Sequence, residues 1–299
     1  MRRFLLRAML AIAILVGFLE LGVRLSGVVS FPLYHADARI GYIPKPSQEG
    51  GFLRTNTWAF NELSMGVARR FDASAAARDL LLVGDSIVLG GNTLPQESKL
   101  AALLESSQGR RVWPIAAGSW AFLNELQYLK DHPDVPRSVG HIVFVLNSGD
   151  FDQASSWACD LTHPRDPPPV ALLYVARKYV HNWAPCGLPP AGLLVPPGDW
   201  RQELKQLIEA GLVNPGRVTV VLYPNRKEAL DPKLMRQRLE THVPELKAIL
   251  GEQLEVISVA RDPRWDAGLY RDDIHPTQRG YQVLSEVLAD VVSVARVSP

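Results

Sequence analysis

Five short apolar runs, separated by helical segments, are the feature that most constrains the fold of this chain. The runs lie at 79–83, 111–117, 141–146, 217–223 and 254–259. Each is apolar at successive positions, which indicates strands covered on both faces. Helical patterns lie between and after them at 95–106, 122–130, around 204–208, at 234–250 and at 277–292. This alternation predicts a doubly wound, three-layer α/β domain with a five-stranded parallel sheet.

The first 26 residues differ in composition from the rest of the chain. An apolar stretch of about 20 residues, near the minimum for a membrane-spanning helix, is interrupted only by Arg7 and Glu20. Positive charge at Arg2 and Arg3 predicts that the N-terminal flank stays in the cytoplasm and that the rest is exported. A cleaved signal peptide and a buried soluble helix are the alternatives. Because no small-x-small cleavage pattern follows the stretch, we expect an uncleaved anchor over 1–26.

The exported part divides into two segments in this interpretation. Residues 27–78 contain prolines, glycines and scattered aromatic residues without a sustained period, so we expect an extracytoplasmic linker and an irregular lead-in. Residues 79–299 form the α/β domain, with a proline-rich insertion at 152–200. An insertion at the end of the third strand is expected to cover that edge of the sheet as a lid or substrate-contact loop. Its tryptophans Trp157, Trp183 and Trp200 either stack on a substrate or pack beneath the loop.

The two cysteines of the chain, Cys159 and Cys186, both lie in this insertion. In an exported protein we expect them to form a disulfide that closes a long loop; two unpaired thiols are the alternative. Without histidines at ligand spacing they do not predict a zinc site.

Composition excludes some classes of function. With 47% apolar and 21% charged residues the chain is typical of a globular protein. The net charge is +1, and no basic face alternates with aromatic residues. We therefore expect no nucleic-acid partner.

Two motifs at opposite ends of the α/β domain carry the candidate chemistry. Gly84-Asp85-Ser86 follows the first strand, and Asp272-Asp273-Ile274-His275-Pro276 lies near the C-terminus. Together they supply a hydroxyl nucleophile, a base and a carboxylate three residues before that base. We predict Ser86 as nucleophile, His275 as base and Asp272 as the acid that orients it. Asp273 is the alternative acid, and Asp85 is expected to be structural.

Three groups at the strand ends are candidate oxyanion donors. They are the backbone N–H of Ser86, the backbone of Gly118 after the second strand, and the side-chain amide of Asn147 after the third. Asn147 is equally consistent with a turn-forming role. The remaining histidines, His163 among them, are expected to be surface or loop residues.

These motifs, in this order, resemble the SGNH/GDSL hydrolase family over about 79–292. The resemblance implies a flavodoxin-like sandwich and assigns the triad to Ser86, His275 and Asp272, with Gly118 as an oxyanion donor. The family's third block is usually Gly-x-Asn-Asp, whereas this chain has Asn147-Ser148-Gly149-Asp150. Alignment on the aspartate matches Asp150, and alignment on the asparagine matches Asn147; both remain open.

The resemblance also implies a reaction and a setting. We expect a serine esterase, or a related O-acyltransferase, that needs no metal or cofactor and acts on acyl esters. Anchored members of the family suggest O-acyl groups of cell-envelope polysaccharide or exopolysaccharide, with a single-pass protein in the inner membrane and its catalytic domain in the periplasm. A lysophospholipase or thioesterase is an alternative if the insertion forms an apolar groove. An inert domain that binds glycan is the non-enzymatic alternative.

Overall fold

The predicted five-stranded parallel sheet is present in the computed structural model, which describes residues 1–181 and 186–294. Its strands are β5 (Leu80–Gly84), β6 (Val112–Ala116), β7 (His141–Leu146), β8 (Val218–Leu222) and β9 (Glu255–Ser258). They pair in the order β6-β5-β7-β8-β9, all parallel. The first of the five therefore lies between the second and the third, which is the flavodoxin-like order.

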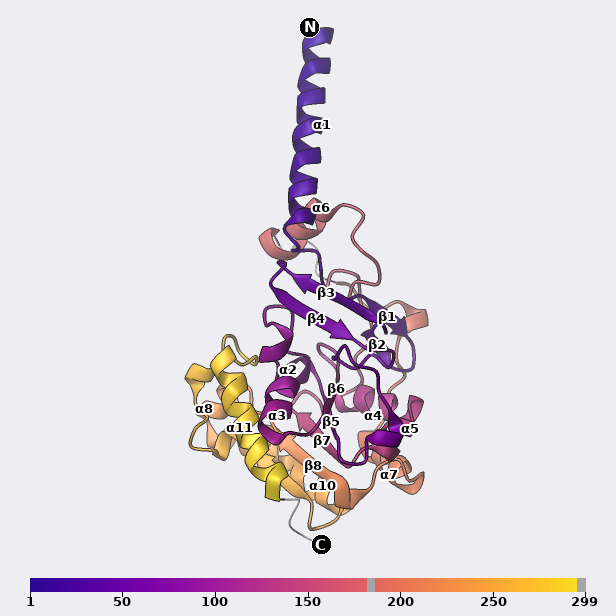
Figure 1. Ribbon diagram of the computed structural model, residues 1–299, viewed down its shortest axis with the longest axis vertical. Coiled ribbons are helices and arrows are strands. Elements are labelled where there is room, and N and C mark those ends of the chain that lie inside the picture. The colour runs from indigo at the N-terminus through magenta and orange to yellow at the C-terminus, as the bar shows by residue number, and fades with distance from the viewer. Residues whose placement is uncertain (182–185, 295–299) are drawn as a thin grey trace.

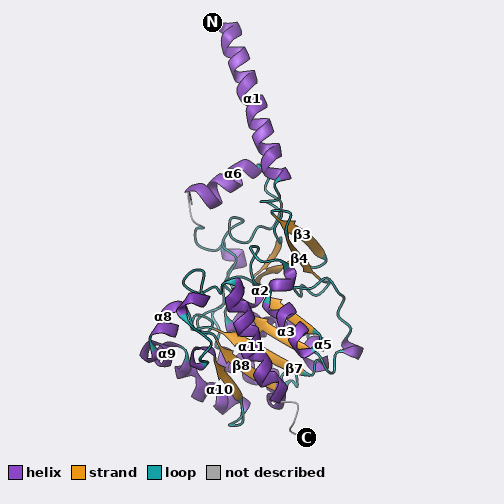
Figure 2. Cartoon of the chain, turned by 60° about the vertical axis from the view of Figure 1, so that its left-hand side comes forward, coloured by secondary structure: helices purple, strands orange, loops and turns teal. Residues whose placement is uncertain are grey.

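Helices cover both faces of this sheet. Successive side chains of β5 point to opposite faces, and they belong to two separate apolar clusters. Leu81 and Val83 pack with α4 (Phe122–Asp131), α7 (Trp200–Glu209) and α10 (Val243–Leu250). Leu80 and Leu82 pack with α2 (Ser86–Leu89), α3 (Leu100–Gln108) and α11 (Gln278–Val294), as Figure 2 shows for α3 and α11. The three-layer prediction is confirmed.

Parallel register brings three strand ends to one level. Gly84 pairs with Ala116 of β6 and with Val145 of β7. The chain therefore leaves β5, β6 and β7 at the same edge of the sheet, and that edge carries the motif residues which follow each strand.

The expectation of an irregular lead-in was wrong. Residues 27–78 contain two antiparallel hairpins, β1 (Tyr34–Asp37) with β2 (Gly41–Pro44) and β3 (Gln48–Phe52) with β4 (Asn56–Phe60). Each strand has only four or five residues, too few for a period to stand out among glycines and prolines. Tyr34 and Tyr42 are buried in the same apolar cluster as α4, so this segment is part of the domain core.

Two predicted helices are broken. The segment 234–250 divides into α9 (Pro232–Arg238), η6 (Glu240–His242) and α10. Pro244 lies in the first turn of α10, where its missing N–H is tolerated but where a continuous helix would lose a hydrogen bond. The segment 95–106 divides into η2 (Gln96–Ser98) and α3, because Lys99 is extended.

The remaining helical elements between the strands are short. They are η1 (Ala73–Ala75), α5 (Asp134–Ser138), η4 (Ala191–Leu193), η5 (Pro215–Arg217), α8 (Arg226–Leu230), η7 (Val259–Arg261) and η8 (Ala267–Leu269).

The N-terminal segment forms one long helix, α1 (Arg2–Leu25), which projects from the domain (Figure 1). None of its residues is buried. It has a mean hydropathy of 2.2 over its most apolar 18 residues and is long enough to cross a membrane, a test that a signal sequence also passes.

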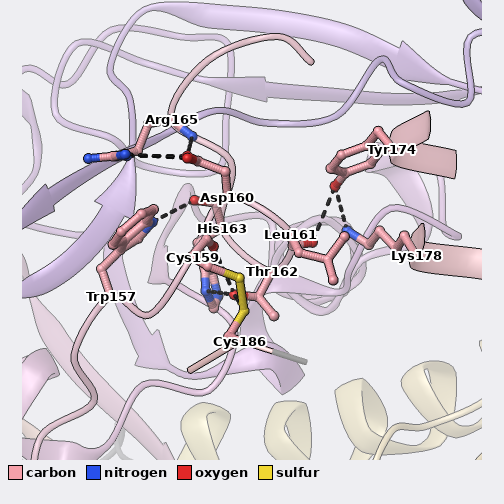
Figure 3. Close-up of a disulfide and its surroundings, with 10 residues drawn as sticks. All are labelled: Trp157, Cys159, Asp160, Leu161, Thr162, His163, Arg165, Tyr174, Lys178 and Cys186. Carbon is pink, nitrogen blue, oxygen red and sulfur yellow. Dashed lines mark hydrogen bonds and ion pairs between the residues drawn. A yellow bond between two sulfur atoms is a disulfide. The ribbon is translucent and has the colours of Figure 1, made fainter. Parts of the chain in front are cut away.

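The insertion after β7 contains α6 (Ala171–Val175) and η3 (Ala176–His181), the latter wound as a π-helix. Cys159 and Cys186 form the expected disulfide, with their Cα atoms 5.5 Å apart (Figure 3). The insertion does more than cover the edge of the sheet, because α6 lies beside the domain-proximal end of α1 (Figures 1 and 2).

Candidate active site

Ser86 is presented at a sharp turn between β5 and α2. Asp85 caps this helix, since its carboxylate accepts from the backbone N–H of Ile87 at 2.9 Å. A Cβ atom on Gly84 would lie 2.6 Å from Val88 Cγ2 and 3.0 Å from the carbonyl oxygen of Val145. Glycine is therefore required at 84 for the strand to end this close to β7 and turn directly into the helix.

The three side chains predicted from the two motifs meet in the fold. His275 Nε2 lies 3.0 Å from Ser86 Oγ, across a sequence separation of 189 residues. His275 Nδ1 lies 2.9 Å from Asp272 Oδ2. Asp273, the alternative acid, is not part of this arrangement; its backbone carbonyl accepts from the Arg226 N–H at 2.8 Å.

The Asp272 carboxylate is held in its charged form. Partial burial alone would raise its pKa, but the backbone N–H groups of His275 and Ile274, together with the His275 ring, outweigh burial and lower the pKa to about 2. An ionised carboxylate accepts the Nδ1–H of His275. The lone pair on Nε2 is therefore directed at the Ser86 hydroxyl, as a general base requires.

The loop that carries His275 is fixed from both sides. The Tyr223 hydroxyl, just after β8, donates to the Ile274 carbonyl at 2.6 Å. The Arg271 N–H donates to the His275 carbonyl at 2.9 Å. Thr277 Oγ1 accepts from the Gly280 N–H at 3.0 Å and so caps α11 directly after the histidine. These bonds limit the movement of the imidazole relative to the sheet.

Gly118 lies at the same edge as Ser86, two residues after the paired position Ala116. Its carbonyl accepts from the Tyr42 hydroxyl at 2.7 Å and from His163 Nε2 at 3.1 Å. Its N–H donates to no atom in the described part of the chain. Two hydrogen bonds therefore fix the Gly118 carbonyl, while the Gly118 N–H has no acceptor in the described part of the chain.

His163 was expected to be a surface or loop residue; it lies in a loop, as expected, but it is partly buried and contacts Gly118. Burial lowers its pKa to about 4, so the imidazole is neutral at pH 7 and donates its Nε2–H to Gly118. The ring stacks on Tyr42 with the centroids 3.9 Å apart. No sequence signal marks this role, because the partners of His163 are Tyr42 in β2 and Gly118 after β6, and both are distant from it in sequence.

Asn147 is both a turn residue and a neighbour of the nucleophile. Its Oδ1 accepts from the Gly149 N–H at 2.8 Å, which is the predicted turn-forming role. Its Nδ2 donates to Asp85 Oδ2 at 3.1 Å. Asp150 closes the turn by accepting from the Asn147 N–H at 2.7 Å. Alignment on the aspartate would place the family's asparagine on Gly149, which has no side chain, whereas Asn147 places an amide beside Asp85.

A cluster of buried carboxyl groups lies beneath the site. Asp85, Asp150 and Glu125 are at most 4% exposed. Burial raises the pKa of all three, and repulsion within the cluster raises those of Glu125 and Asp150 further. Neither carboxyl oxygen of Glu125 has a hydrogen-bond partner in the described part of the chain. Burial and mutual repulsion therefore both favour the neutral forms of these carboxyl groups.

A hollow of about 530 Å³ adjoins Gly118 on the side of the insertion. Most of its lining side chains carry polar groups, including Tyr42, Ser119, Ser155, His163 and Lys178. Two of its lining residues, Ser119 and His163, are neighbours of Gly118, which makes the hollow a candidate binding site for part of a substrate.

Other candidate ligands from the sequence are not at this site. Trp157 and Trp200 are both buried: Trp157 donates to the His163 carbonyl at 2.7 Å within the insertion, and Trp200, at the start of α7, packs on Phe122 and Phe151. Trp183 lies outside the described residues. Within residues 1–181 and 186–294, no three His, Cys, Asp or Glu side chains are gathered as a metal ligand set.

Comparisons with known proteins give matches at the level of structure. No family model and no curated protein matches the chain. A member of the lipolytic protein G-D-S-L family from Veillonella parvula DSM 2008 is similar, with 13% identity, a TM-score of 0.41 and coverage of 73% of this chain and 99% of that one. A psychrotrophic esterase from Pseudoalteromonas sp. has 12% identity, a TM-score of 0.41 and coverage of 72% and 97%. A carbohydrate esterase family 2 enzyme from Corynascus thermopiles has 14% identity, a TM-score of 0.41 and coverage of 76% and 68%.

Proposed function

We propose that this chain is a serine enzyme of the SGNH/GDSL type that acts on acyl esters. The observation that carries the proposal is the 3.0 Å contact between His275 Nε2 and Ser86 Oγ, with Asp272 on the other ring nitrogen. A hydroxyl, a base and an ionised acid in this order are the parts needed for acyl transfer. The arrangement lies at the carboxyl edge of a parallel sheet, where such folds bind ligands.

The reaction follows from the geometry. Ser86 Oγ attacks the ester carbonyl carbon as its proton passes to His275 Nε2, and the resulting imidazolium is stabilised by Asp272. The tetrahedral intermediate collapses when the ester C–O bond breaks and His275 returns the proton to the leaving alkoxide. Water, or an acceptor hydroxyl, then attacks the acyl-enzyme by the same steps in reverse order.

Three donors are proposed for the oxyanion. The Gly118 N–H is unused in the described part of the chain, and the Ser86 N–H lies at the start of α2. Asn147 Nδ2 has a second hydrogen beyond the one given to Asp85. The raised pKa values of the buried carboxyl groups limit the negative charge beneath the site, and this favours an oxyanion above it.

The substrate class is proposed from the hollow beside Gly118. Hydroxyl and imidazole groups in its lining suit a hydroxylated ligand, so we favour O-acyl groups on a carbohydrate. The same lining would seat an acceptor hydroxyl, which keeps O-acyl transfer as the second candidate function. Apolar atoms nevertheless contribute the larger share of the surface that lines the hollow, and a lysophospholipase or thioesterase is therefore the alternative.

The setting is proposed from α1 and the disulfide. The length and hydropathy of α1 suit a single membrane span, and a disulfide in the insertion suits an oxidising compartment. We place the protein in the inner membrane with the α/β domain in the periplasm. A reporter fused after Pro299 should be active only outside the cytoplasm, and activity in the cytoplasm would contradict this orientation.

Turnover of short-chain nitrophenyl esters by the detergent-solubilised full-length protein tests the function. Ser86→Ala should reduce kcat by roughly 10³-fold or more, whereas Ser74→Ala, at an exposed serine remote from the site, should leave it unchanged. Undiminished turnover by Ser86→Ala would refute the proposed nucleophile. A folded wild-type protein that hydrolyses none of a panel of acyl esters would favour the inert glycan-binding domain.

A further inference from the structure

We propose that α6 and η3 of the insertion lie on the membrane surface, beside the point where α1 leaves the bilayer. The partner of this surface is the lipid interface itself. The inference rests on the proposed anchoring role of α1 and is independent of the ester chemistry. It assigns to the insertion a position that its sequence alone does not indicate.

The first observation is a polar connection between α1 and α6. The Glu20 carboxylate of α1 accepts from the backbone N–H of Ala171 at 2.9 Å and of Leu172 at 2.8 Å. These are two of the N–H groups that a helix start leaves unsatisfied. Arg24 pairs with Glu20 at 2.8 Å and donates to the carbonyls of Pro168 and Pro169 at 3.0 and 2.9 Å. The start of α6 is thereby fixed to one side of α1.

The second observation is the level of this connection along α1. Leu19 precedes Glu20, and Leu21 and Leu25 follow it, all about half exposed. The polar contact is therefore made within the apolar length of α1, not beyond its end. A helix attached at that level lies where acyl chains meet headgroups, if α1 spans the bilayer.

The third observation is which side chains α6 and η3 turn outward. Ala171 is buried, the Tyr174 ring packs on Phe31 with centroids 5.1 Å apart, and Lys178 Nζ donates to the Tyr174 hydroxyl at 2.9 Å. These residues face the protein. The exposed positions along this segment are mostly apolar: they are Val170, Leu173, Arg177 and Val180, and Tyr179 is exposed as well.

This distribution is reversed relative to a helix that faces water. A water-facing helix presents polar residues outward, whereas here Leu173 is 52% and Val180 70% exposed. The apolar face continues the exposed apolar surface of α1, to which α6 is attached. Arg177 among these residues can extend its charged end to the headgroups. A lipid interface is the environment that satisfies all four side chains.

The insertion also connects this surface to the active site. The Cys159–Cys186 disulfide encloses α6 and η3 in one covalent loop. Within the same loop His163 donates to the Gly118 carbonyl, and Figure 3 shows His163, the disulfide, Tyr174 and Lys178 gathered together. The segment proposed to lie on the lipid surface and a residue that contacts Gly118 therefore belong to one disulfide-closed loop.

Site-directed spin labelling tests the inference on the full-length protein in vesicles of phosphatidylcholine and phosphatidylglycerol. A nitroxide is placed on Leu173→Cys, with Leu15→Cys on α1 as the lipid reference. Leu230→Cys is the matched control, because Leu230 is an exposed leucine, 67% accessible, at the end of α8. Power saturation then compares collision with oxygen, which concentrates in lipid, and with a water-soluble nickel chelate.

At positions 173 and 15 the nitroxide should collide more with oxygen than with the chelate, and at position 230 the order should reverse. A label at 173 that behaves like the one at 230 overturns the inference. So does a label at 15 that is exposed to the chelate, since α1 would then not span the bilayer. Nitrophenyl ester turnover on the same samples reports the proposed function separately: lipid exposure at 173 without turnover contradicts the function alone.

Discussion

At the scale of single residues, the Ser86 hydroxyl has two acceptors within reach but only one proton. His275 Nε2 lies 3.0 Å from Ser86 Oγ, and Asp85 Oδ2 lies 3.3 Å from it. Burial raises the pKa of Asp85, which favours its protonated form. A carboxyl group whose neutral form is favoured is a weaker acceptor for the Ser86 hydroxyl at 3.3 Å, so the shorter contact with His275 Nε2 is the preferred direction for the serine proton.

The Asp272–His275 contact should matter chiefly for the rate. Asp272→Asn keeps a side-chain acceptor for the backbone N–H groups but removes the charge that stabilises the imidazolium, so kcat should fall by about 10²- to 10⁴-fold. Asp273→Asn is the matched control, because Asp273 contributes only its backbone to this part of the structure. Steady-state turnover of a nitrophenyl ester measures both. An equal effect of the two substitutions would show that Asp272 does not orient the base.

Glu125 should make stability depend on pH. Because burial raises its pKa well above 4.5, its favourable contribution is complete below pH 4.5 and is lost as pH rises through the raised value. The wild type should therefore lose up to about 1.4 kcal/mol of unfolding free energy per pH unit in that window relative to Glu125→Gln. Urea unfolding across pH, with exposed Glu209→Gln as control, measures the difference. A difference that stays constant with pH would contradict the assignment.

At the scale of elements, two segments outside the parallel sheet converge on Gly118. The hairpin β1–β2 supplies Tyr42 and the insertion supplies His163, and both donate to the same carbonyl. The segment before β5 and the insertion after β7 thus both contact the edge of the sheet at Gly118. This arrangement explains why the residues before β5 are part of the core.

Removal of the Tyr42 hydroxyl should affect catalysis more than folding. One hydrogen bond contributes about 0.5–1.5 kcal/mol, so Tyr42→Phe should lower kcat by roughly 2- to 10-fold through a less well-placed Gly118 N–H. Tyr34→Phe is the control, because its ring contacts His163 but its hydroxyl makes no bond to Gly118. Separate measurement of kcat and KM distinguishes this effect from loss of substrate binding. Identical kinetics for the two variants would exclude a role for the Gly118 bond.

The disulfide should stabilise the insertion. It closes a loop across a separation of 27 residues, for which chain entropy gives about 3.5 kcal/mol. Replacement of Cys159 and Cys186 by serine should lower the unfolding free energy by up to that amount and make the insertion sensitive to limited proteolysis before the sheet. If protease cleaves both forms at the same rate, the disulfide does not hold this segment.

At the scale of the whole molecule, the sheet was predictable because it depends on local patterns, and the meeting of Ser86 with His275 and Asp272 was predictable because two short motifs mark residues that lie far apart in the sequence. Five runs apolar on both faces specify buried parallel strands, and parallel strands bring their carboxyl ends to one edge. The lead-in hairpins, the role of His163 and the contact of Glu20 with α6 were not predictable. Each depends on tertiary contacts between distant segments, and none leaves a period or a motif in the sequence.

The broken helices at 95–106 and 234–250 show a related limit. The apolar spacing of a helix continues across Lys99 and Leu239, although the helix itself is interrupted at both residues. Pro244 was the available signal for the second break, because a proline is tolerated in the first turn of a helix but not in its interior. Likewise, the sequence left two alignments of the block 147–150 open, and only the fold shows that the Asn147 amide lies beside Asp85.

The site at which a fluorophosphonate attaches shows whether Ser86 is an activated nucleophile. The folded full-length protein is treated with the reagent, digested and analysed by mass spectrometry. We expect a phosphonyl adduct on Ser86, absent from Ser86→Ala and strongly slowed in His275→Ala. An adduct on another serine, or none on the folded wild-type protein, would contradict this role of Ser86.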